Sequence, residues 1–276
     1  MKRLAVSHLR ERLGLSERKA CLLVDISSSV LRYQPKTNDN DVVRERLRKL
    51  AEQRKRLGSP RLHILLKREG LVINHKRTER LYREEGLVLR KKRRRKGAAG
   101  ARVVIPFPQR TNERWSMDFV TDSIVTGRRF RALAIVDDYS RECPAIKVGT
   151  SLGGRRVVAV LERLAAVRGL PEAITIDNGP EFAGRVLDEW AYRRGVKLSF
   201  IRPGKPMENA YIESFNRRFR DECLNTNWFL SLRHARDIIE EWRTDYNEGR
   251  PHTSRGGLTP REYAQGNGEI LTAFGL

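Results

Sequence analysis

Three acidic residues carry the strongest chemical signal in this chain. Asp118 and Asp177 each end an apolar, strand-like stretch, and Glu213 follows Asp177 by 36 positions at the start of a helical pattern. Carboxylate oxygens are the ligands that hard divalent cations such as Mg²⁺ and Mn²⁺ prefer. Enzymes that cut and join phosphodiester bonds hold two such ions roughly 4 Å apart. We therefore predict that Asp118, Asp177 and Glu213 are catalytic residues and metal ligands.

The residues around the three acids form distinct sequence words. They are Trp-Ser-Met-Asp-Phe-Val at 115–120, Thr-Ile-Asp-Asn-Gly-Pro-Glu-Phe at 175–182 and Asn-Ala-Tyr-Ile-Glu-Ser-Phe-Asn at 209–216. These words, their order and the 35 residues between Asp177 and Glu213 resemble the catalytic core shared by retroviral integrases and bacterial insertion-sequence transposases. Within that group, the chain is similar above all to the second-reading-frame, OrfB-type product of the integrase-like insertion elements.

The resemblance implies a transposase with the polynucleotidyl transferase chemistry of the DDE type. Such an enzyme binds the ends of its mobile element, cleaves DNA and joins the freed 3′-OH to a target phosphodiester by metal-dependent transesterification. The resemblance also implies Mg²⁺ or Mn²⁺ as cofactor, DNA as partner and a homo-oligomer assembled on DNA. In some elements the active protein is fused to, or paired with, an upstream-frame product.

Three other functions stay open. A ribonuclease H-like nuclease would share the fold, although it needs no basic helical region to read a sequence. A regulator that only binds DNA would be favoured by the loss of an acid, but all three acids are present. A product that is inactive without the upstream frame would be recognised from inverted repeats and an overlapping frame in the flanking DNA.

Positive charge is concentrated in the first part of the chain. Residues 1–102 contain 30 Lys and Arg against 11 Asp and Glu, a net charge of +19, whereas residues 103–276 contain 26 against 23, a net charge of +3. A basic N-terminal part followed by a nearly neutral remainder is typical of a polyanion-binding module joined to a catalytic core. We expect residues 1–102 to supply most of the DNA affinity, with a steep dependence on salt.

A helix-turn-helix pattern lies within residues 42–90. Ser59 as N-cap and Pro60 as the first helical residue favour one helix, and Asn74 caps a second. Two short helices joined by a Gly-containing turn are typical of modules whose second helix enters the major groove of DNA. A plain helical hairpin with solvated charges is the alternative, but the charge excess coincides with the motif and favours DNA contact.

Candidates for DNA contact are cations and one amide, because such side chains bind phosphates. They are Lys76, Arg77 and Arg80 of the predicted recognition helix; the basic run Lys91, Lys92, Arg93, Arg94, Arg95 and Lys96; Lys205 of a Gly- and Pro-rich loop; and Asn209, Arg217 and Arg220 near Glu213. Consecutive cations cannot pack against one another, so the basic run predicts an exposed tether. A solvated surface role is the alternative for Lys205.

Apolar periodicity predicts the elements of the core. Trp115, Met117 and Phe119 alternate with polar residues, which predicts a strand whose apolar face lies opposite Asp118. Similar patterns predict strands at 130–136, 145–148, 173–176 and 197–200, and helices at 157–165 and 182–193. This order matches a ribonuclease H-like core, a name that the resemblance supplies. The expected fold class is α/β, an integrase core with a five-stranded mixed sheet and flanking helices, preceded by an all-α helix-turn-helix region.

We expect five segments along the chain. They are an N-terminal helical segment at 1–34, the helix-turn-helix DNA-binding region at 42–90, a basic linker at 91–104, the catalytic core at 105–225 and a C-terminal helical extension of the core at 226–276. Asp137 and Asp138 form the one competing acidic pair, and we interpret them as a turn at the end of a strand.

Several classes of protein are excluded by composition. The three cysteines lie far apart without a CxxC pair, which argues against a zinc finger or a disulfide framework. No stretch approaches the roughly 18 apolar residues of a membrane span, and the charged start lacks the apolar run of a signal peptide. A cytoplasmic protein without a membrane partner is the expectation.

Overall fold

The structure is a computed structural model, and it describes residues 2–33, 40–90, 107–179, 181–182, 184–202 and 209–266. The chain divides into two compact units, Met1–Val43 and Arg44–Leu276. The second unit contains both the predicted helix-turn-helix region and the sheet. The predicted basic run at 91–96 lies outside the described residues.

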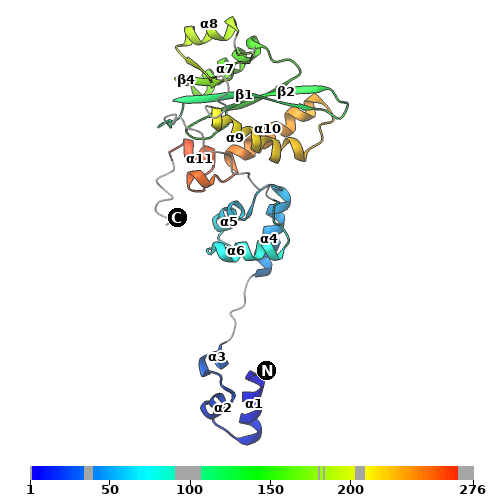
Figure 1. Cartoon of the computed structure of the whole chain (residues 1–276), viewed down its shortest axis with the longest axis vertical. Coiled ribbons are helices and arrows are strands. Elements are labelled where there is room, and N and C mark those ends of the chain that lie inside the picture. Colours follow the sequence, from blue (N-terminus) through cyan, green and yellow to red (C-terminus); the bar gives the residue numbers. More distant parts are fainter. Residues whose placement is uncertain are drawn as a thin grey trace. The chain divides into compact units, whose positions relative to one another are not determined.

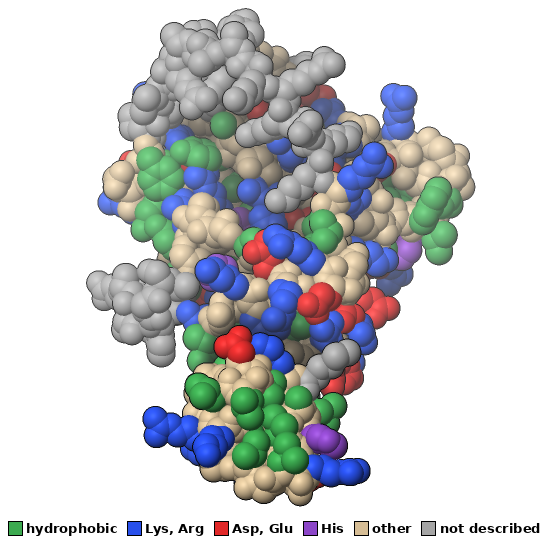
Figure 2. Space-filling model, turned by 60° about the horizontal axis from the view of Figure 1, so that its bottom comes forward, with side chains coloured by type: hydrophobic (Ala, Val, Ile, Leu, Met, Phe, Trp, Pro, Cys, Tyr) green, Lys and Arg blue, Asp and Glu red, His purple; other side chains and the backbone are tan. Residues whose placement is uncertain are grey.

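The first unit consists of short helices, α1 (Lys2–Leu13), α2 (Glu17–Val24) and α3 (Ser28–Arg32). The side chains of Ser16 and Ser27 accept hydrogen bonds from backbone N–H groups and so cap α2 and α3. Large apolar side chains remain exposed on this unit, and Figure 2 shows apolar side chains gathered on its surface. They include Leu4, Leu13, Leu22 and Leu23.

The helix-turn-helix region is built from α4 (Asn40–Gln53), α5 (Ser59–Arg68) and α6 (His75–Glu84). Each helix contributes a fully buried leucine to its interior: Leu47, Leu62 and Leu81. The Nδ1 atom of His63 lies 2.8 Å from Oγ1 of Thr78, which joins α5 to α6.

The start of α5 differs by one residue from the prediction. Its N-cap is Gly58, so Ser59 already belongs to the helix and its predicted role as N-cap is wrong. The N–H groups of a first helical turn have no partner within the helix, which is why Pro60 is tolerated there. The predicted cap of α6 is confirmed, because the N–H of Lys76 donates to Oδ1 of Asn74 over 2.9 Å.

A five-stranded mixed sheet forms the centre of the second unit (Figure 1). Its strands are β1 (Arg114–Ser123), β2 (Arg129–Asp137), β3 (Ala145–Gly149), β4 (Ala173–Ile176) and β5 (Lys197–Phe200). The spatial order is β3-β2-β1-β4-β5. The pairs β1–β2 and β2–β3 are antiparallel, while β1–β4 and β4–β5 are parallel. The long strand β1 therefore joins the antiparallel half to the parallel half.

Two helices cover one face of the sheet, α7 (Gly154–Arg168) and α8 (Arg185–Arg194). Trp115 and Met117 of β1 and Ile174 and Ile176 of β4 pack into this layer, as their alternation predicts. The start of α8 differs from the prediction, because Phe182 lies outside the helix. Its ring stacks on Phe119 with 5.0 Å between the ring centroids.

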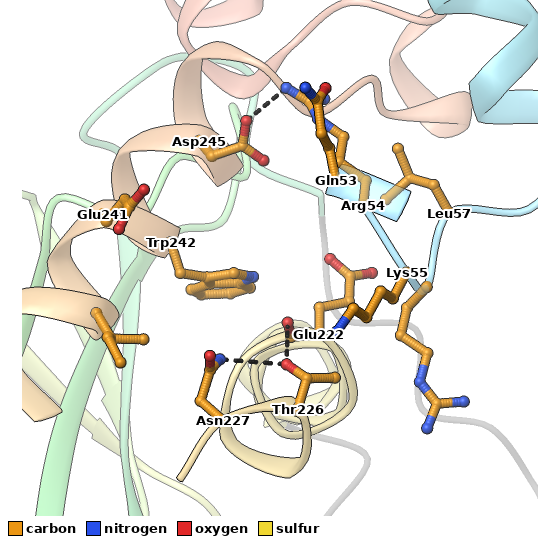
Figure 3. A pocket seen from close by; sticks show the side chains of 12 residues that line it. Gln53, Arg54, Lys55, Leu57, Glu222, Thr226, Asn227, Glu241, Trp242 and Asp245 are labelled. Carbon is orange, nitrogen blue, oxygen red and sulfur yellow. Dashed lines mark hydrogen bonds and ion pairs between the residues drawn. The ribbon is translucent and has the colours of Figure 1, made fainter. Parts of the chain in front are cut away.

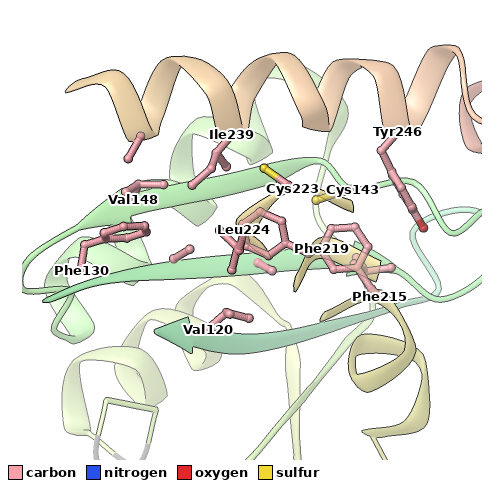
Figure 4. Close-up of a cluster of buried hydrophobic side chains, with 14 of the residues drawn as sticks. Val120, Phe130, Cys143, Val148, Phe215, Phe219, Cys223, Leu224, Ile239 and Tyr246 are labelled. Carbon is pink, nitrogen blue, oxygen red and sulfur yellow. The ribbon is translucent and has the colours of Figure 1, made fainter. Parts of the chain in front are cut away.

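The opposite face is also apolar and is covered by α9 (Ala210–Glu222) and α10 (Leu232–Glu248) (Figure 4). Phe215 and Phe219 of α9 and Tyr246 of α10 pack against Val120 and its neighbours on β1 and β2. Helices therefore cover both faces of the sheet. The helix α11 (Pro260–Ala264) follows. It begins with a capping box, in which Thr259 and Glu262 form reciprocal hydrogen bonds.

Two arginines join the helix-turn-helix region to the last helices of the core. Arg54, just after α4, forms an ion pair with Asp245 and donates to the carbonyl oxygen of Gly249. Arg68, at the end of α5, forms an ion pair with Glu262 in which Nη2 and Oε2 are 2.7 Å apart. The region is therefore fastened to the core at two points.

The architecture confirms the predicted fold class, an α/β core with a five-stranded mixed sheet and flanking helices behind an all-α helix-turn-helix region. Among the described residues, no helix is both long and apolar enough to span a membrane.

Candidate active site

The alternation of side chains along two neighbouring strands brings Asp118 and Asp177 together. Parallel pairing sets Ser116 of β1 opposite Thr175 of β4, and Asp118 and Asp177 each follow two residues later. Because successive side chains of a strand point to opposite faces, both acids lie on the face covered by α9. The adjacent isoleucines and tryptophan pack into the other layer. Two carboxylates therefore meet where β1 passes the end of β4.

The helix α9 brings Glu213 to the same place. Ile212, Phe215 and Phe219 anchor α9 on the sheet, which leaves Glu213 in the first turn on an exposed side of the helix. One turn later, Nδ2 of Asn216 donates a 2.7 Å hydrogen bond to Oδ2 of Asp118. This bond fixes α9 against β1.

The negative charges of Asp177 and Glu213 act on Asp118. Burial, together with the negative charges of Asp177 and Glu213, raises the pKa of Asp118 to about 6. Hydrogen bonds from the N–H of Phe119 and from Asn216 only partly oppose this rise. No Lys or Arg forms an ion pair with Asp118 in the ranges that the structure describes. The site therefore carries uncompensated negative charge.

The acids are neighbours, but their side chains are not arranged as the ligands of a metal ion. Within the described ranges, no three His, Cys, Asp or Glu side chains are gathered closely enough to hold a metal ion. The oxygens of Asp118 accept hydrogen bonds from Phe119 and Asn216, and Oδ1 of Asp177 accepts one from the N–H of Gly179 over 3.1 Å. The donor set nevertheless fits a hard divalent cation, because it consists of oxygens and its charge is not balanced.

The loop after Asp177 brings the backbone of Gly179 close to two carboxylates. A Cβ atom at Gly179 would lie 3.0 Å from Oδ1 of Asp177 and 3.3 Å from Oε2 of Glu181. Glu181 forms an ion pair with Arg131, whose guanidinium lies 4.1 Å from the ring centroid of Phe119. These contacts hold the loop beside the carboxylates.

The competing acidic pair has a structural role, as predicted. Oδ1 of Asp137 accepts hydrogen bonds from the backbone N–H groups of Tyr139 and Ser140. Asp138 is buried. Its Oδ2 atom accepts a hydrogen bond from Nε of Arg114, and its Oδ1 atom accepts one from the hydroxyl of Ser116, each over 2.7 Å. Both acids thus stabilise the turn after β2.

The predicted DNA contacts fall into three groups. Lys76, Arg77 and Arg80 lie on α6, where Lys76 and Arg80 are exposed. Arg217 and Arg220 are exposed on α9, the helix that carries Glu213. Lys205 and the run Lys91, Lys92, Arg93, Arg94, Arg95 and Lys96 lie outside the described residues. Asn209 is only 4% exposed, so its side chain offers no surface to DNA in this arrangement.

One contact at the site had no specific sequence signal. Asn216 shares the polar stripe of α9 with Glu213, but the stripe alone does not indicate which residue holds Asp118. The spacing of three between Glu213 and Asn216 was the available hint, since such residues lie on the same side of a helix.

Comparisons with known proteins agree with this organisation. Models of the integrase core domain match residues 108–206 and 194–260, and a model of an HTH-like domain matches residues 38–96. The 31.7 kDa protein of insertion element IS407 from Burkholderia multivorans is 50% identical over 94% of this chain and 94% of its own. The 39.2 kDa protein of insertion element IS476 from Xanthomonas euvesicatoria is 44% identical over 95% of this chain and 76% of its own.

More distant similarities extend to a transposase and to a solved structure. The transposase InsF of insertion sequence IS3A from Escherichia coli is 22% identical over 78% of each chain. The catalytic core domain of HTLV-2 integrase, solved in complex with magnesium, aligns with a TM-score of 0.42 and 17% identity over 55% of this chain and 95% of its own. On the strength of the long, high-identity matches and the integrase core models, the chain belongs to the transposases of bacterial insertion elements that carry an integrase core.

Proposed function

We propose that this chain binds the ends of its mobile element, cleaves DNA there and joins the freed 3′-OH to a target phosphodiester. The observation that supports the proposal is the pKa of Asp118, which burial and the negative charges of Asp177 and Glu213 raise to about 6. Uncompensated carboxylates of this kind suit a divalent cation better than a proton relay, because a cation removes the repulsion among all three.

Asp118, Asp177 and Glu213 would hold Mg²⁺ or Mn²⁺. When bound, such ions stabilise the negative charge that develops during phosphodiester exchange. Asn216 would keep Asp118 in place through its 2.7 Å hydrogen bond, so that the carboxylate keeps one orientation during DNA binding. Gly179 would keep the approach to Asp177 clear, since any side chain there would crowd its Oδ1 atom.

DNA would contact two sets of cations. Lys76, Arg77 and Arg80 on α6 would follow the groove of the element end, and Arg217 and Arg220 on α9 would bind phosphates beside the acids. Paired ends require more than one protein copy, so we expect a homo-oligomer on DNA, with or without an upstream-frame product.

A strand-transfer assay tests the catalytic part of this proposal. Full-length protein, end-containing DNA and Mg²⁺ should give nicked ends and joined products. Binding of end DNA without either product would refute the transposase reaction and favour a regulator that only binds DNA.

Neutralising two cations of α6 should weaken DNA binding in a salt-dependent way. The double variant Lys76→Ala/Arg80→Ala removes two exposed positive charges. We expect the slope of log K against log salt to become shallower by about 2, because each phosphate contact contributes roughly 0.9. Fluorescence anisotropy over a salt series measures the slope. Lys49→Ala, an exposed cation on α4 paired with Glu45, is the control and should leave it unchanged.

A further inference from the structure

A groove lined by cations lies beside β3, the strand at one edge of the sheet. We call it the β3 groove, and it has a volume of ≈ 300 Å³. The charged side chains that line it are Lys147, Arg156, Arg163 and Arg236. The rest of its lining consists of apolar residues and a glycine, and none of the described residues that line it is acidic. The β3 groove is therefore a concave surface with charge of one sign.

Three elements of the core bring these cations to one place. Lys147 precedes Val148, whose side chain packs into the layer of α9 and α10, so Lys147 points to the side of α7. Arg156 and Arg163 lie seven residues apart on α7 and therefore share one side of that helix. From α10, Nε of Arg236 donates a 3.2 Å hydrogen bond to the carbonyl oxygen of Val148. This bond holds the guanidinium group at the edge of the sheet.

The positive charge of the β3 groove is not balanced. Within the ranges that the structure describes, no carboxylate forms an ion pair with any of its four cations. Two other arginines of the same helices are paired, Arg168 of α7 with Glu142 and Arg243 of α10 with Glu240. Burial lowers the pKa of Lys147, and the positive charges of the three arginines of the groove contribute to the lowering. An anion in the groove would relieve this repulsion.

A larger groove elsewhere in this unit has mixed charge (Figure 3). The charged residues that line it are Arg54, Lys55 and Arg56 before α5, Glu222 at the end of α9, and Glu241 and Asp245 on α10. Asp245 already forms an ion pair with Arg54. An anion in this larger groove would meet three carboxylates, whereas one in the β3 groove would meet only cations among the described lining residues.

We infer that the β3 groove binds a phosphate group of the DNA backbone. A guanidinium group presents several donors in one plane, and this arrangement matches the oxygens of a phosphate. Arg156, Arg163 and Arg236 are exposed, so the groove is accessible to a phosphate that belongs to a long polymer. The choice of DNA as the source of the phosphate rests on the proposed function, whereas the phosphate chemistry does not.

The lining of the β3 groove fits DNA whose sequence is not read. Contacts to phosphates fix the position of DNA and carry no sequence information directly. Asparagine and glutamine, which read adenine, are absent from the described residues that line the groove. In the proposed reaction, the DNA that is not selected by the α6 helix is the target. The β3 groove would therefore hold target DNA.

The β3 groove is separate from the candidate active site. The strand β2 lies between β3 and β1, and neighbouring strands are roughly 4.8 Å apart. Asp118 lies on the face covered by α9, whereas Lys147 points to the side of α7. A phosphate in the groove would thus be held away from the bond that is cut. Its contribution would be to DNA affinity and not to the chemical step.

Inorganic phosphate tests the chemistry of the groove without DNA. Melting temperatures of the full-length chain are measured in sodium phosphate and in sodium chloride of equal ionic strength. We expect phosphate to raise the melting temperature of the wild type by about 2 °C. Lys147→Gln and Arg163→Gln should each lose most of this rise. In chloride, neither should melt below the wild type, because each substitution removes a charge that repels its neighbours.

Two further variants make the result specific. Arg155→Gln removes an exposed arginine of α7 that does not line the β3 groove, and it should keep the full response to phosphate. Arg163→Lys retains the positive charge and should keep a reduced response, because an ammonium group lacks the planar donors. An undiminished response in both Lys147→Gln and Arg163→Gln, or an equal loss in Arg155→Gln, would overturn the site.

A DNA arm identifies the source of the phosphate. Fluorescence anisotropy over a salt series is measured with two duplexes, one that contains an element end and one of unrelated sequence. Arg163→Gln should make the slope of log K against log salt shallower by about 1 on both duplexes, since one phosphate contact is lost. Arg155→Gln should leave both slopes unchanged.

The outcomes separate the possible sources. A response to inorganic phosphate combined with unchanged slopes would overturn DNA as the source and would favour an acidic protein partner. A change confined to the duplex with the element end would overturn the assignment to target DNA. Failure of strand transfer by the wild type would refute the proposed reaction but would leave the phosphate response intact, so the two failures are distinguishable.

Discussion

Asp118→Asn should reduce end cleavage and joining by at least about a hundredfold while leaving binding of end DNA unchanged. The amide keeps the shape of the side chain but lacks the negative charge that would hold the cation. A hydrogen-bond acceptor for the new amide group is already present, because Oδ1 of Asn216 is buried and has no hydrogen bond among the described residues. Rotation of that amide would allow Asn216 to accept from the new side chain. The variant should therefore fold normally.

Although Asp118→Asn should reduce activity, it should increase the stability of the folded protein in the absence of metal. The folded pKa of Asp118 is about 6, above the ordinary value of 3.8, so the folded protein holds this proton more tightly than the unfolded chain does. Stability present below pH 3.8 is then lost as the pH rises to about 6. Asparagine does not ionise, so Asp118→Asn should be more stable than the wild type at pH 7.5, by up to about 3 kcal/mol, without metal. The difference should vanish near pH 4.

Strand-transfer and gel-shift assays measure the first effect, and denaturant unfolding in EDTA at both pH values measures the second. Asp122→Asn, on the same strand, is the matched control and should retain activity, because the hydrogen bond that Asp122 accepts comes from the N–H of its neighbour Ser123. Asp177→Asn and Glu213→Gln should lose activity as Asp118→Asn does. Joining at more than about a hundredth of the wild-type rate in any of the three would remove that residue from the site.

Removal of divalent metal should abolish strand transfer, and Mg²⁺ or Mn²⁺ alone should restore it. The three acids offer only oxygen ligands, which zinc disfavours relative to nitrogen and sulfur. Calcium should bind without supporting the reaction, because its looser coordination does not hold nucleophile and phosphate in line. The measurement is strand transfer after EDTA treatment, with single metals added back. Full activity in EDTA, or with zinc alone, would contradict the metal site.

A binding measurement separates metal binding from catalysis. Mg²⁺ should raise the melting temperature of the wild type at pH 7.5, because it relieves the repulsion among the three carboxylates. Asp118→Asn should respond less, since one of the three charges is missing. An equal response of both proteins would mean that Mg²⁺ stabilises the chain elsewhere.

The sequence predicted most of the elements around the site because they follow local rules. Alternation along β1 and β4 placed Asp118 and Asp177 opposite the residues that pack under α7 and α8. Caps such as Asn74 and Thr259 have a local signature in the chain. Ser59 shows the limit of such rules, because a serine before a proline fits both the cap and the first helical position.

What the sequence could not predict depends on contacts between distant residues. Val120 lies in the polar register of β1, yet it is buried because α9 and α10 cover that face. Phe182 fits a helical pattern but packs on Phe119, 63 positions earlier. The ion pair between Arg54 and Asp245 joins residues 191 positions apart, and no periodic pattern in the sequence indicates it.

The two ion pairs that fasten the helix-turn-helix region have a consequence for the DNA. Arg54 and Arg68 hold α4 and α5 on the core, and α6 packs on α5, so α6 and the three acids are separated by a set span. Each base pair of B-form DNA adds about 3.4 Å along the helix axis. A set span in the protein thus becomes a set number of base pairs between the sequence that α6 reads and the bond that is cut. Inserting one base pair into that interval should therefore shift the cut by one base pair away from the terminus of the element, because the distance between the sequence that is read and the bond that is cut stays the same.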